Sequence, residues 1–187
     1  GIRQGQAPAS TASPPGEGKT VFVTDAAGCR QAFVGVGSNQ VDPARQVQLA
    51  VAALGELPRS SLAACSSLYR SAPFGPVEQP DFINAVAQLQ TELDVTALFR
   101  CLQSIELQQG RRRGERWGPR IIDLDLLVFG DDVISSADLT VPHPGIAERN
   151  FVLLPLQEIA PDLNIPGLGK VADIAVDRHE PRISRID

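Results

Sequence analysis

Two aspartates interrupt an apolar segment in the second half of the sequence. Residues 120–129 read RIIDLDLLVF, with Asp123 and Asp125 separated by one leucine. In a β-strand, side chains two positions apart share a face, so the two carboxylates would point the same way, about 7 Å apart along the backbone. Carboxylates paired in this way can hold a divalent cation. The residues that would face the core on the other side of the strand are Ile122, Leu124, Leu126 and Val128.

The negative charge of this pair needs a counterpart. Two carboxylates about 5 Å apart repel each other by roughly 3 kcal/mol at an effective dielectric constant of about 20. One interpretation is structural, because nearby arginines could pair with the aspartates in an ion-pair network. The other is functional, because Mg²⁺ prefers one or two carboxylates together with water and substrate phosphates. The two aspartates alone do not decide between these interpretations.

A cluster of arginines stands directly before the aspartates, in the stretch GRRRGERWGPR at 110–120. Three adjacent arginines alone would indicate a solvated basic loop. Followed by paired carboxylates, they favour a polyanion bridged by a metal ion, and phosphoryl transfer is the reaction class that uses such a site. We see no Ser-His-Asp set, histidine cluster or reactive-cysteine motif, so we expect catalysis by positioning and charge stabilisation. The arginines concerned are Arg111, Arg112, Arg113, Arg116 and Arg120.

Strand and helix patterns in the rest of the sequence must position these residues. A helix is predicted after each of two N-cap candidates, Asp42 and Asp94, and a short helix within 149–163. The resulting order β-α-β-β-α-β predicts an α+β fold with a ferredoxin-like core, an antiparallel sheet with helices, and C-terminal additions. The predicted strands are 32–37, 61–70, 81–93 and 120–129.

The two ends of the sequence differ from this core. Residues 1–19 are rich in Gly, Pro, Ala and Ser, which predicts a flexible tail. We assign all of 1–31 to this tail or linker, although 21–23 could form a short strand. The stretch SPPGEGKT at 13–20 approaches a phosphate-binding P-loop, but it lacks the first glycine, a preceding buried strand and a good helix start. We therefore place the domain at 32–168 and a polar C-terminal tail at 169–187.

The overall composition excludes several classes of function. The 187 residues are 43% hydrophobic and 21% charged, as in ordinary globular proteins. The net charge of −5 argues against nucleic-acid binding, and no apolar run is long enough to span a bilayer. The three cysteines form no CxxC pair, which indicates reduced thiols. We expect a cytoplasmic monomer that binds small molecules and neither nucleic acid nor membranes.

The motif RWGPRIIDLDLL at 116–127 resembles the signature of the 6-hydroxymethyl-7,8-dihydropterin pyrophosphokinase family. The resemblance covers about 32–168 and implies transfer of pyrophosphate from MgATP to the hydroxymethyl group of the dihydropterin, with release of AMP, in folate biosynthesis. Other segments that resemble the family, in the family's order, are VGVGSN (34–39), LYRSAPFGPVEQPDFINAV (68–86), IELQQGR (105–111), LTVPHPGIAER (139–149) and FVLLPLQEIAPDL (151–163).

The same resemblance implies roles for individual residues. Asp123 and Asp125 match the pair that binds two Mg²⁺ ions. Arg111 and Arg120 match arginines that assist transfer, and Trp117 matches a tryptophan that closes over both substrates. The implied ATP-binding positions are Gln103, Glu106, Arg113, Trp117, Arg120, Leu126, Thr140, His143 and Arg149. The implied substrate-binding positions are Ser71, Ala72, Phe74, Phe82, Asn84, Trp117 and Phe151.

Simpler interpretations stay open for some of these residues. Polar helix residues such as Gln103 and Glu106 are usually solvated, and Phe82 or Phe151 alone would fit core packing. Asp138 stands where some relatives of the family carry a basic residue, which puts one ATP contact in doubt. A noncatalytic ligand-binding module with this fold is the rival function, but it leaves the arginines and aspartates of 111–125 unexplained.

Overall fold

The computed structural model describes residues 28–75, 78–110 and 120–186. The main sheet contains β1 (Arg30–Ser38), β2 (Ser60–Cys65), β3 (Leu68–Ser71), β4 (Phe82–Thr91), β5 (Asp123–Phe129) and β10 (Ile183–Ile186). The helices are α1 (Pro43–Gly55), α2 (Val95–Gln108) and α3 (Asn150–Ile159). Two small hairpins pair β6 (Ile134–Ser135) with β7 (Thr140–Val141) and β8 (Asn164–Ile165) with β9 (Gly169–Lys170), and a 3-10 turn, η1 (Val171–Asp173), follows.

The main sheet is antiparallel, with the strand order β10-β3-β4-β1-β5 and β2 also paired to β4. Strand β1, the first in the described part of the chain, therefore lies between β4 and β5. This is the arrangement of the split β-α-β-β-α-β motif, so the predicted α+β fold with a ferredoxin-like core is confirmed.

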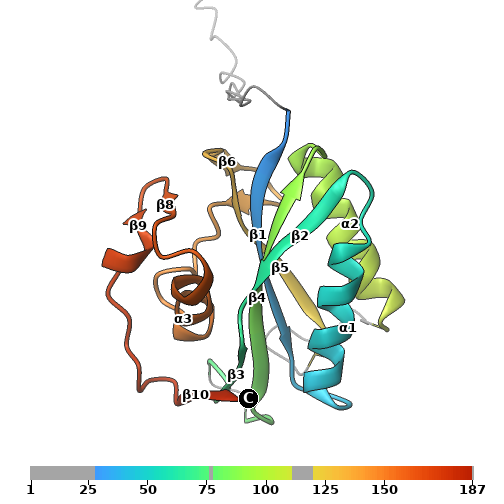
Figure 1. The fold of residues 1–187 in the computed structure, drawn as a ribbon. Helices are drawn as coiled ribbons and strands as arrows, with labels where there is room; N and C mark the ends of the chain where they lie inside the picture. Colours follow the sequence, from blue (N-terminus) through green and yellow to red (C-terminus); the bar gives the residue numbers. More distant parts are fainter. Residues whose placement is uncertain (1–27, 76–77, 111–119, 187) are drawn as a thin grey trace, which may run out of the picture.

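The sheet separates two apolar layers (Figure 1). Helices α1 and α2 cover one face, whereas α3 and the segment with β8 and β9 cover the other. Because side chains alternate along a strand, Val34 and Val36 of β1 pack in the cluster that contains Leu98 of α2. Phe33, on the opposite face, packs in the cluster that contains Leu153 of α3. No described helix is both long and apolar enough to cross a bilayer.

Both predicted N-caps begin helices. The Asp94 carboxylate accepts a hydrogen bond from the Ala97 backbone N–H at 2.8 Å, in the extended conformation usual for a cap. Asp42 accepts from the Arg45 N–H at 3.4 Å and has a φ of 57°, in the left-handed region. The cap of α2 is therefore the better formed of the two.

The predicted strand at 61–70 is interrupted. Ser66 breaks it into β2 and β3, because its hydroxyl accepts a hydrogen bond from the Val86 backbone N–H at 2.9 Å and donates to the Ser67 carbonyl at 2.8 Å. The side chain thus takes a place that a strand backbone would fill. Both halves still pair with β4.

Strand β5 begins at Asp123, three residues later than predicted, and contains a bulge. Val34 pairs with Leu126 and Phe33 with Val128, so Leu127 has no counterpart on β1. The extra residue turns the rest of the strand over, and Val128 packs in the cluster on the α3 side. The prediction that Val128 shares the core face of Leu126 is therefore wrong.

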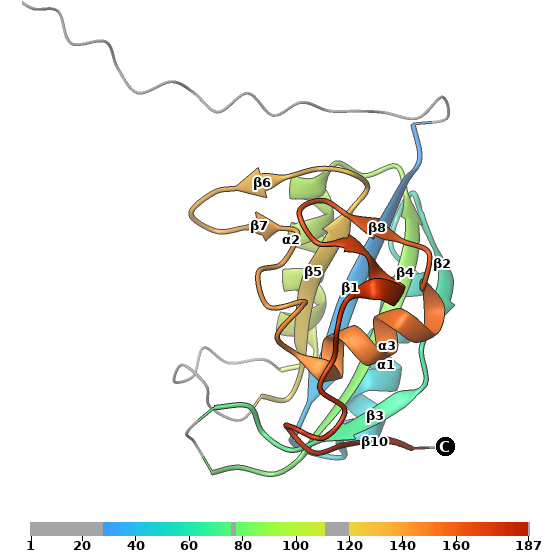
Figure 2. The ribbon, with the colours of Figure 1, turned by 90° about the vertical axis from the view of Figure 1, so that its left-hand side faces the viewer.

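The C-terminal residues add a strand where the sequence predicts a polar tail at 169–187. Strand β10 pairs with β3 and extends the main sheet at its edge (Figure 2). Ile186 packs against the core, which the alternation of apolar and charged residues in ISRI permits. The short strand considered at 21–23 and the rejected P-loop at 13–20 lie outside the described residues.

We expect Asp94→Ala to lower the free energy of unfolding by about 1 kcal/mol, because it leaves a backbone N–H of α2 without its cap. Urea denaturation followed by circular dichroism measures this change. The matched variant Asp42→Gly should change stability by only a few tenths of a kcal/mol, since glycine tolerates the positive φ and the bond that is lost is long. Equal effects of the two variants would contradict the difference in cap geometry.

Candidate active site

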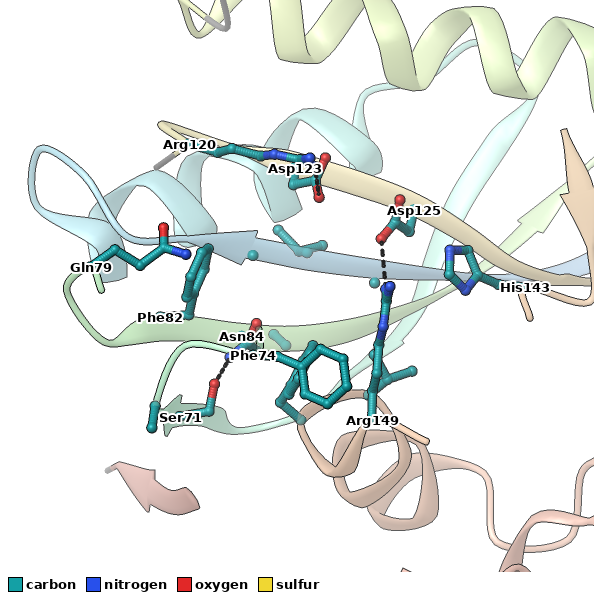
Figure 3. A pocket seen from close by; sticks show the side chains of 17 residues that line it. Ser71, Phe74, Gln79, Phe82, Asn84, Arg120, Asp123, Asp125, His143 and Arg149 are labelled. Carbon is teal, nitrogen blue, oxygen red and sulfur yellow. Dashed lines mark hydrogen bonds and ion pairs between the residues drawn. The ribbon is translucent and has the colours of Figure 1, made fainter. Parts of the chain in front are cut away.

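A cavity of about 290 Å³ opens on the face of the sheet that carries α3 (Figure 3). Strands β1, β4 and β5 form its floor, Ser71, Ala72, Phe74 and Gln79 form one wall, and the start of α3 forms another. The cavity thus gathers side chains from distant parts of the sequence. The predicted site residues that line it are Ser71, Ala72, Phe74, Phe82, Asn84, Arg120, Asp123, Asp125, His143, Arg149 and Phe151.

Two glycines of β1 make the floor of this cavity flat. Gly37 pairs with Asn84 on one side and with Asp123 on the other, so it separates an amide from a carboxylate across the sheet. A Cβ atom at Gly37 would lie 3.1 Å from the Asn84 Oδ1, whereas one at Gly35 would lie 3.5 Å from the Leu127 side chain, an ordinary contact. A ligand can therefore lie directly on the β1 backbone between the two polar groups.

Both carboxylates of β5 face the cavity, as the strand spacing predicts, and each has an arginine nearby. The Arg120 Nη1 lies 2.6 Å from the Asp123 Oδ2. The Arg149 Nη1, reaching across from the start of α3, lies 3.9 Å from the Asp125 Oδ2 (Figure 3). The ion pairs expected from the structural interpretation are thus present in part, because arginines from two separate segments lie beside the aspartates.

These arginines do not remove the electrostatic strain at Asp125. Displacement of water by the surrounding protein, followed by the negative charge of Asp123, raises the pKa of Asp125 to about 7. Arg149 and Arg120 oppose this rise. The side chain nevertheless stays 39% accessible, so a cation can approach it from the cavity. Within the part of the chain that the structure describes, Arg120 and Arg149 thus do not fully offset the effects that raise the pKa of Asp125, and the carboxylate is open to ligands.

The donor set at this face fits a hard divalent cation that brings its own ligands. Among the described residues, no group of three or more His, Cys, Asp or Glu side chains could enclose a metal ion. Mg²⁺ is usually held by one or two carboxylates and completes its shell with water and phosphate oxygens. Asp123 and Asp125 offer that number of carboxylates, so the residues present fit Mg²⁺ bound together with a phosphate ligand.

His143 is held as a neutral hydrogen-bond donor. Its Nδ1 accepts a hydrogen bond from the Gly145 backbone N–H at 3.0 Å, so the proton of the neutral ring lies on Nε2. Burial and then the charge of Arg149 lower the pKa of His143, and the charge of Asp123 opposes this. At neutral pH the ring can donate one hydrogen bond from Nε2 to an anionic ligand.

The opposite side of the cavity combines an amide with aromatic rings. Asn84 is buried, and its Nδ2 donates to the Ser71 hydroxyl at 2.9 Å, which fixes the amide plane (Figure 3). The rings of Phe74 and Phe151 lie 6.2 Å apart between centroids at 59°, and Phe82, at the start of β4, also lines the cavity. A flat heteroaromatic molecule with a hydrogen-bonding edge suits this combination.

Asn39, just after β1, links the two sides. The Asn39 side-chain Oδ1 accepts a hydrogen bond from the Arg120 backbone N–H at 2.9 Å. The Asn39 backbone N–H donates to the Arg120 carbonyl at 3.1 Å. Its Nδ2 donates to the Gln79 Oε1 at 3.0 Å and to the Pro80 carbonyl at 3.2 Å. Asn39, which is buried, thus holds both Arg120, three residues before Asp123, and the pair Gln79 and Pro80, just before β4.

Four predicted ATP positions lie away from the cavity lining. Gln103 is exposed on α2, and Thr140 is exposed on β7. Glu106 is buried at the end of α2, where it accepts a hydrogen bond from the Leu124 backbone N–H at 2.7 Å and so supports the edge of β5. The Leu126 side chain packs in the core on the side of α1 and α2, so only its backbone can face a ligand. Arg111, Arg113 and Trp117 lie outside the described residues.

Some residues at the site were not predicted from the sequence: Gly35, Gly37 and Gln79 line the cavity, and Asn39 binds Gln79. Glycines at two alternate positions of an apolar strand are the signal that was available, because they remove side chains from one face only. The turn-like GSN gives no hint that its asparagine is buried.

Comparison with known proteins gives consistent matches. The profile of the family described as 7,8-dihydro-6-hydroxymethylpterin-pyrophosphokinase (HPPK) matches residues 33–161. A protein of Pseudomonas aeruginosa named 2-amino-4-hydroxy-6-hydroxymethyldihydropteridine pyrophosphokinase is 47% identical over 137 residues, which cover 73% of this chain and 85% of that protein. A protein of the same name from Haemophilus influenzae is 45% identical over 135 residues, covering 72% and 84%.

Solved structures with a similar fold include Plasmodium falciparum HPPK-DHPS, in a crystal structure with pteroate. It matches with a TM-score of 0.64 and 15% identity over 78% of this chain. This chain covers 42% of that longer one. At this level of identity the match supports the fold alone.

We expect Asn39→Ala to lower the free energy of unfolding by about 2 kcal/mol and to speed hydrogen exchange at the Arg120 amide, because buried partners lose their hydrogen bonds. Asn39→Asp is the matched variant, since it keeps the acceptor for Arg120 but loses the donor to Gln79 and Pro80. Exchange at Arg120 should stay close to wild type in that variant. Fast exchange in both, or in neither, would contradict the two-sided role of this residue.

Proposed function

The chain belongs to the 7,8-dihydro-6-hydroxymethylpterin-pyrophosphokinase family, and we propose how the residues around its cavity carry out the reaction of that family. The protein transfers pyrophosphate from ATP to hydroxymethyldihydropterin in folate synthesis. One observation supports placing this reaction in the cavity. The carboxylates that suit a metal–phosphate complex and the amide that suits a pterin edge stand on either side of Gly37.

In this proposal, the nucleophile is the hydroxyl group of the substrate. Its oxygen attacks the β-phosphorus of ATP, and a new O–P bond forms while the bond from that phosphorus to the α–β bridging oxygen breaks. AMP leaves with the electron pair of the broken bond, and the hydroxyl proton passes to a phosphate oxygen or to water. The protein contributes orientation and charge, as is usual for phosphoryl transfer.

The phosphate side consists of the two aspartates and the groups around them. Asp123 and Asp125 would hold Mg²⁺, which when bound offsets the negative charge of the phosphates. Arg120 and Arg149 already point at these carboxylates, so they are within reach of phosphate oxygens placed there. His143 would donate from Nε2 to one further oxygen, because its Nδ1 is occupied by Gly145.

The pterin side consists of Asn84, Ser71 and the aromatic wall. Ser71 holds the amide of Asn84 in place, and this amide would read the hydrogen-bonding edge of the pterin. Phe82 and Phe151 would enclose the ring, with Phe74 next to Phe151. A pterin bound against Asn84 would direct its hydroxymethyl group over Gly37 towards the aspartates.

The nucleotide product tests this function. Incubation of the protein with MgATP and 6-hydroxymethyl-7,8-dihydropterin should release AMP, measured by chromatography, in proportion to the pyrophosphorylated pterin. A noncatalytic binding module would release nothing, and a P-loop NTPase would release ADP. Either of these results would overturn the proposal.

We expect Asp123→Asn and Asp125→Asn each to lower kcat by about 100-fold or more, because each removes one charge from the face that holds the metal and its phosphates. Steady-state AMP release over a series of Mg²⁺ concentrations measures this. The exposed Asp131, just beyond β5, provides the control, and Asp131→Asn should keep the wild-type rate. Near-normal turnover in either Asp123→Asn or Asp125→Asn would contradict the proposed role of that residue in holding the metal.

We expect Gly37→Ala to raise the KM for the pterin by about tenfold, since the new methyl group displaces the Asn84 amide and covers the floor. Gly55→Ala at the end of α1, outside the cavity, is the matched control, because its methyl group would make only an ordinary contact with Leu62 at 3.7 Å. The KM for ATP and the thermal stability of both variants are measured alongside. If both substitutions have the same effect on the pterin, the floor between Asn84 and the aspartates has no special role.

A further inference from the structure

A buried amide stands between two residues of the site at the start of α3. Asn150 is 3% exposed, and its neighbours Arg149 and Phe151 both line the cavity. The Asn150 Nδ2 donates to the Asp177 carbonyl at 3.0 Å and to the Pro181 carbonyl at 2.8 Å. This side chain therefore turns away from the substrates and binds the C-terminal segment.

The same C-terminal segment is attached to α3 a second time, two helical turns further on. Gln157 lies seven residues after Asn150, on the same side of the helix. Its Nε2 donates to the Val171 carbonyl at 3.1 Å and to the Ile174 carbonyl at 3.1 Å. Residues 171–181 thus run back along α3 and reach Asn150 at the end that borders the cavity.

Beyond Asn150 the segment reaches the opposite wall of the cavity. The Arg182 carbonyl accepts from the Ala72 backbone N–H at 2.8 Å, and Ile183 then pairs with Ser71 as β10 begins (Figure 2). The Arg182 guanidinium donates to both carboxylate oxygens of Asp81, at 3.2 and 3.0 Å. The residues held in this way are immediate neighbours of Phe82 and of the Ser71 that orients the pterin-side amide.

We propose that Asn150 is a positioning residue, which sets the first turn of α3 against the β3 wall through the segment 177–183. This inference rests on the proposed site, because it assigns Phe151 and Ser71 to the same bound pterin. Asn150 acts on Phe151 directly, as its neighbour in the helix. It acts on Ser71 through the Pro181 carbonyl and the residues that follow.

The other end of α3 is fixed separately. Glu158 accepts from the Ser67 backbone N–H at 3.1 Å, from the Ser67 hydroxyl at 2.7 Å and from the Tyr69 hydroxyl at 2.7 Å. That end of the helix is thus tied to the start of β3 without help from the C-terminal segment. Loss of Asn150 would therefore release the end beside the cavity and leave the distant end in place.

The Asn150 amide is also an unusual choice for stability alone. Its Oδ1 is buried and has no hydrogen-bond partner among the described residues. A buried polar atom without a partner destabilises the fold. The burial of Oδ1 therefore offsets part of the stability that the two hydrogen bonds from Nδ2 provide. A role in fixing the geometry of the site accounts for an amide at this position.

The test compares Asn150→Ala with Gln157→Ala. Each substitution removes a side-chain amide of α3 that donates to two carbonyls of the C-terminal segment, but only Asn150 is flanked by residues that line the cavity. We expect both to lower the melting temperature, whereas only Asn150→Ala should lower kcat/KM for 6-hydroxymethyl-7,8-dihydropterin, by about fivefold. Rates are measured well below the lower melting temperature, so that every variant is folded.

Equal losses of kcat/KM in the two variants, or wild-type kinetics in Asn150→Ala, would overturn the inference. Should Asn150→Ala fail to fold, Arg182→Gln decides. The Arg182 side chain is 75% exposed and pairs with Asp81, the neighbour of Phe82. Loss of this ion pair should raise the KM for the pterin about twofold without changing the KM for ATP. An unchanged pterin KM there would also count against the inference. Absence of AMP release by the wild-type protein would instead refute the proposed function, so the two failures are distinguishable.

Discussion

Repulsion between Asp123 and Asp125 is the constraint around which the cavity is arranged. Two carboxylates on one face of a strand, partly withdrawn from water, are stable only if positive charge is supplied from elsewhere. Arg120 supplies it from the segment before the strand, and Arg149 supplies it from a helix that follows much later in the chain. Burial and the charge of Asp123 still raise the pKa of Asp125, so among the described residues these two arginines do not fully offset them. In the proposed function, a bound metal–nucleotide complex would supply further positive charge at this face.

The two faces of the sheet divide the work of folding and binding. The face under α1 and α2 is filled by one apolar cluster, so it can supply most of the stability. The face under α3 is apolar at one end and hollow at the other, where Gly35 and Gly37 replace larger side chains. Such a hollow weakens local packing, and buried hydrogen bonds from Asn39 and Asn150 hold its rim. Buried polar side chains therefore stabilise the rim of the cavity through hydrogen bonds, whereas apolar contacts stabilise the rest of the sheet.

The sequence predicted the parts of this structure that depend on local patterns. The order of strands and helices, both aspartate caps and the shared direction of the two carboxylates follow from spacing and residue type, and all are found. Features that depend on tertiary contacts were missed. Nothing in GSN shows that Asn39 meets Pro80, because that contact needs two distant turns to come together. Likewise β10 consists of few residues, and only the edge offered by β3 makes it a strand.

The bulge at Leu127 has a consequence for how this protein can vary. The alternation of side chains before Leu127 is independent of the alternation after it, because the bulge lies between them. The aspartates therefore keep their direction when residues beyond the bulge change. Deleting Leu127 would restore an unbroken ladder in which Val128 still faces α3 and Phe129 still faces α1 and α2, as both do now. The loss would be the Leu127 side chain itself, which is buried under α3 beside Gly35. A deletion at this point should therefore open space in the core next to the cavity floor, while both aspartates keep their direction.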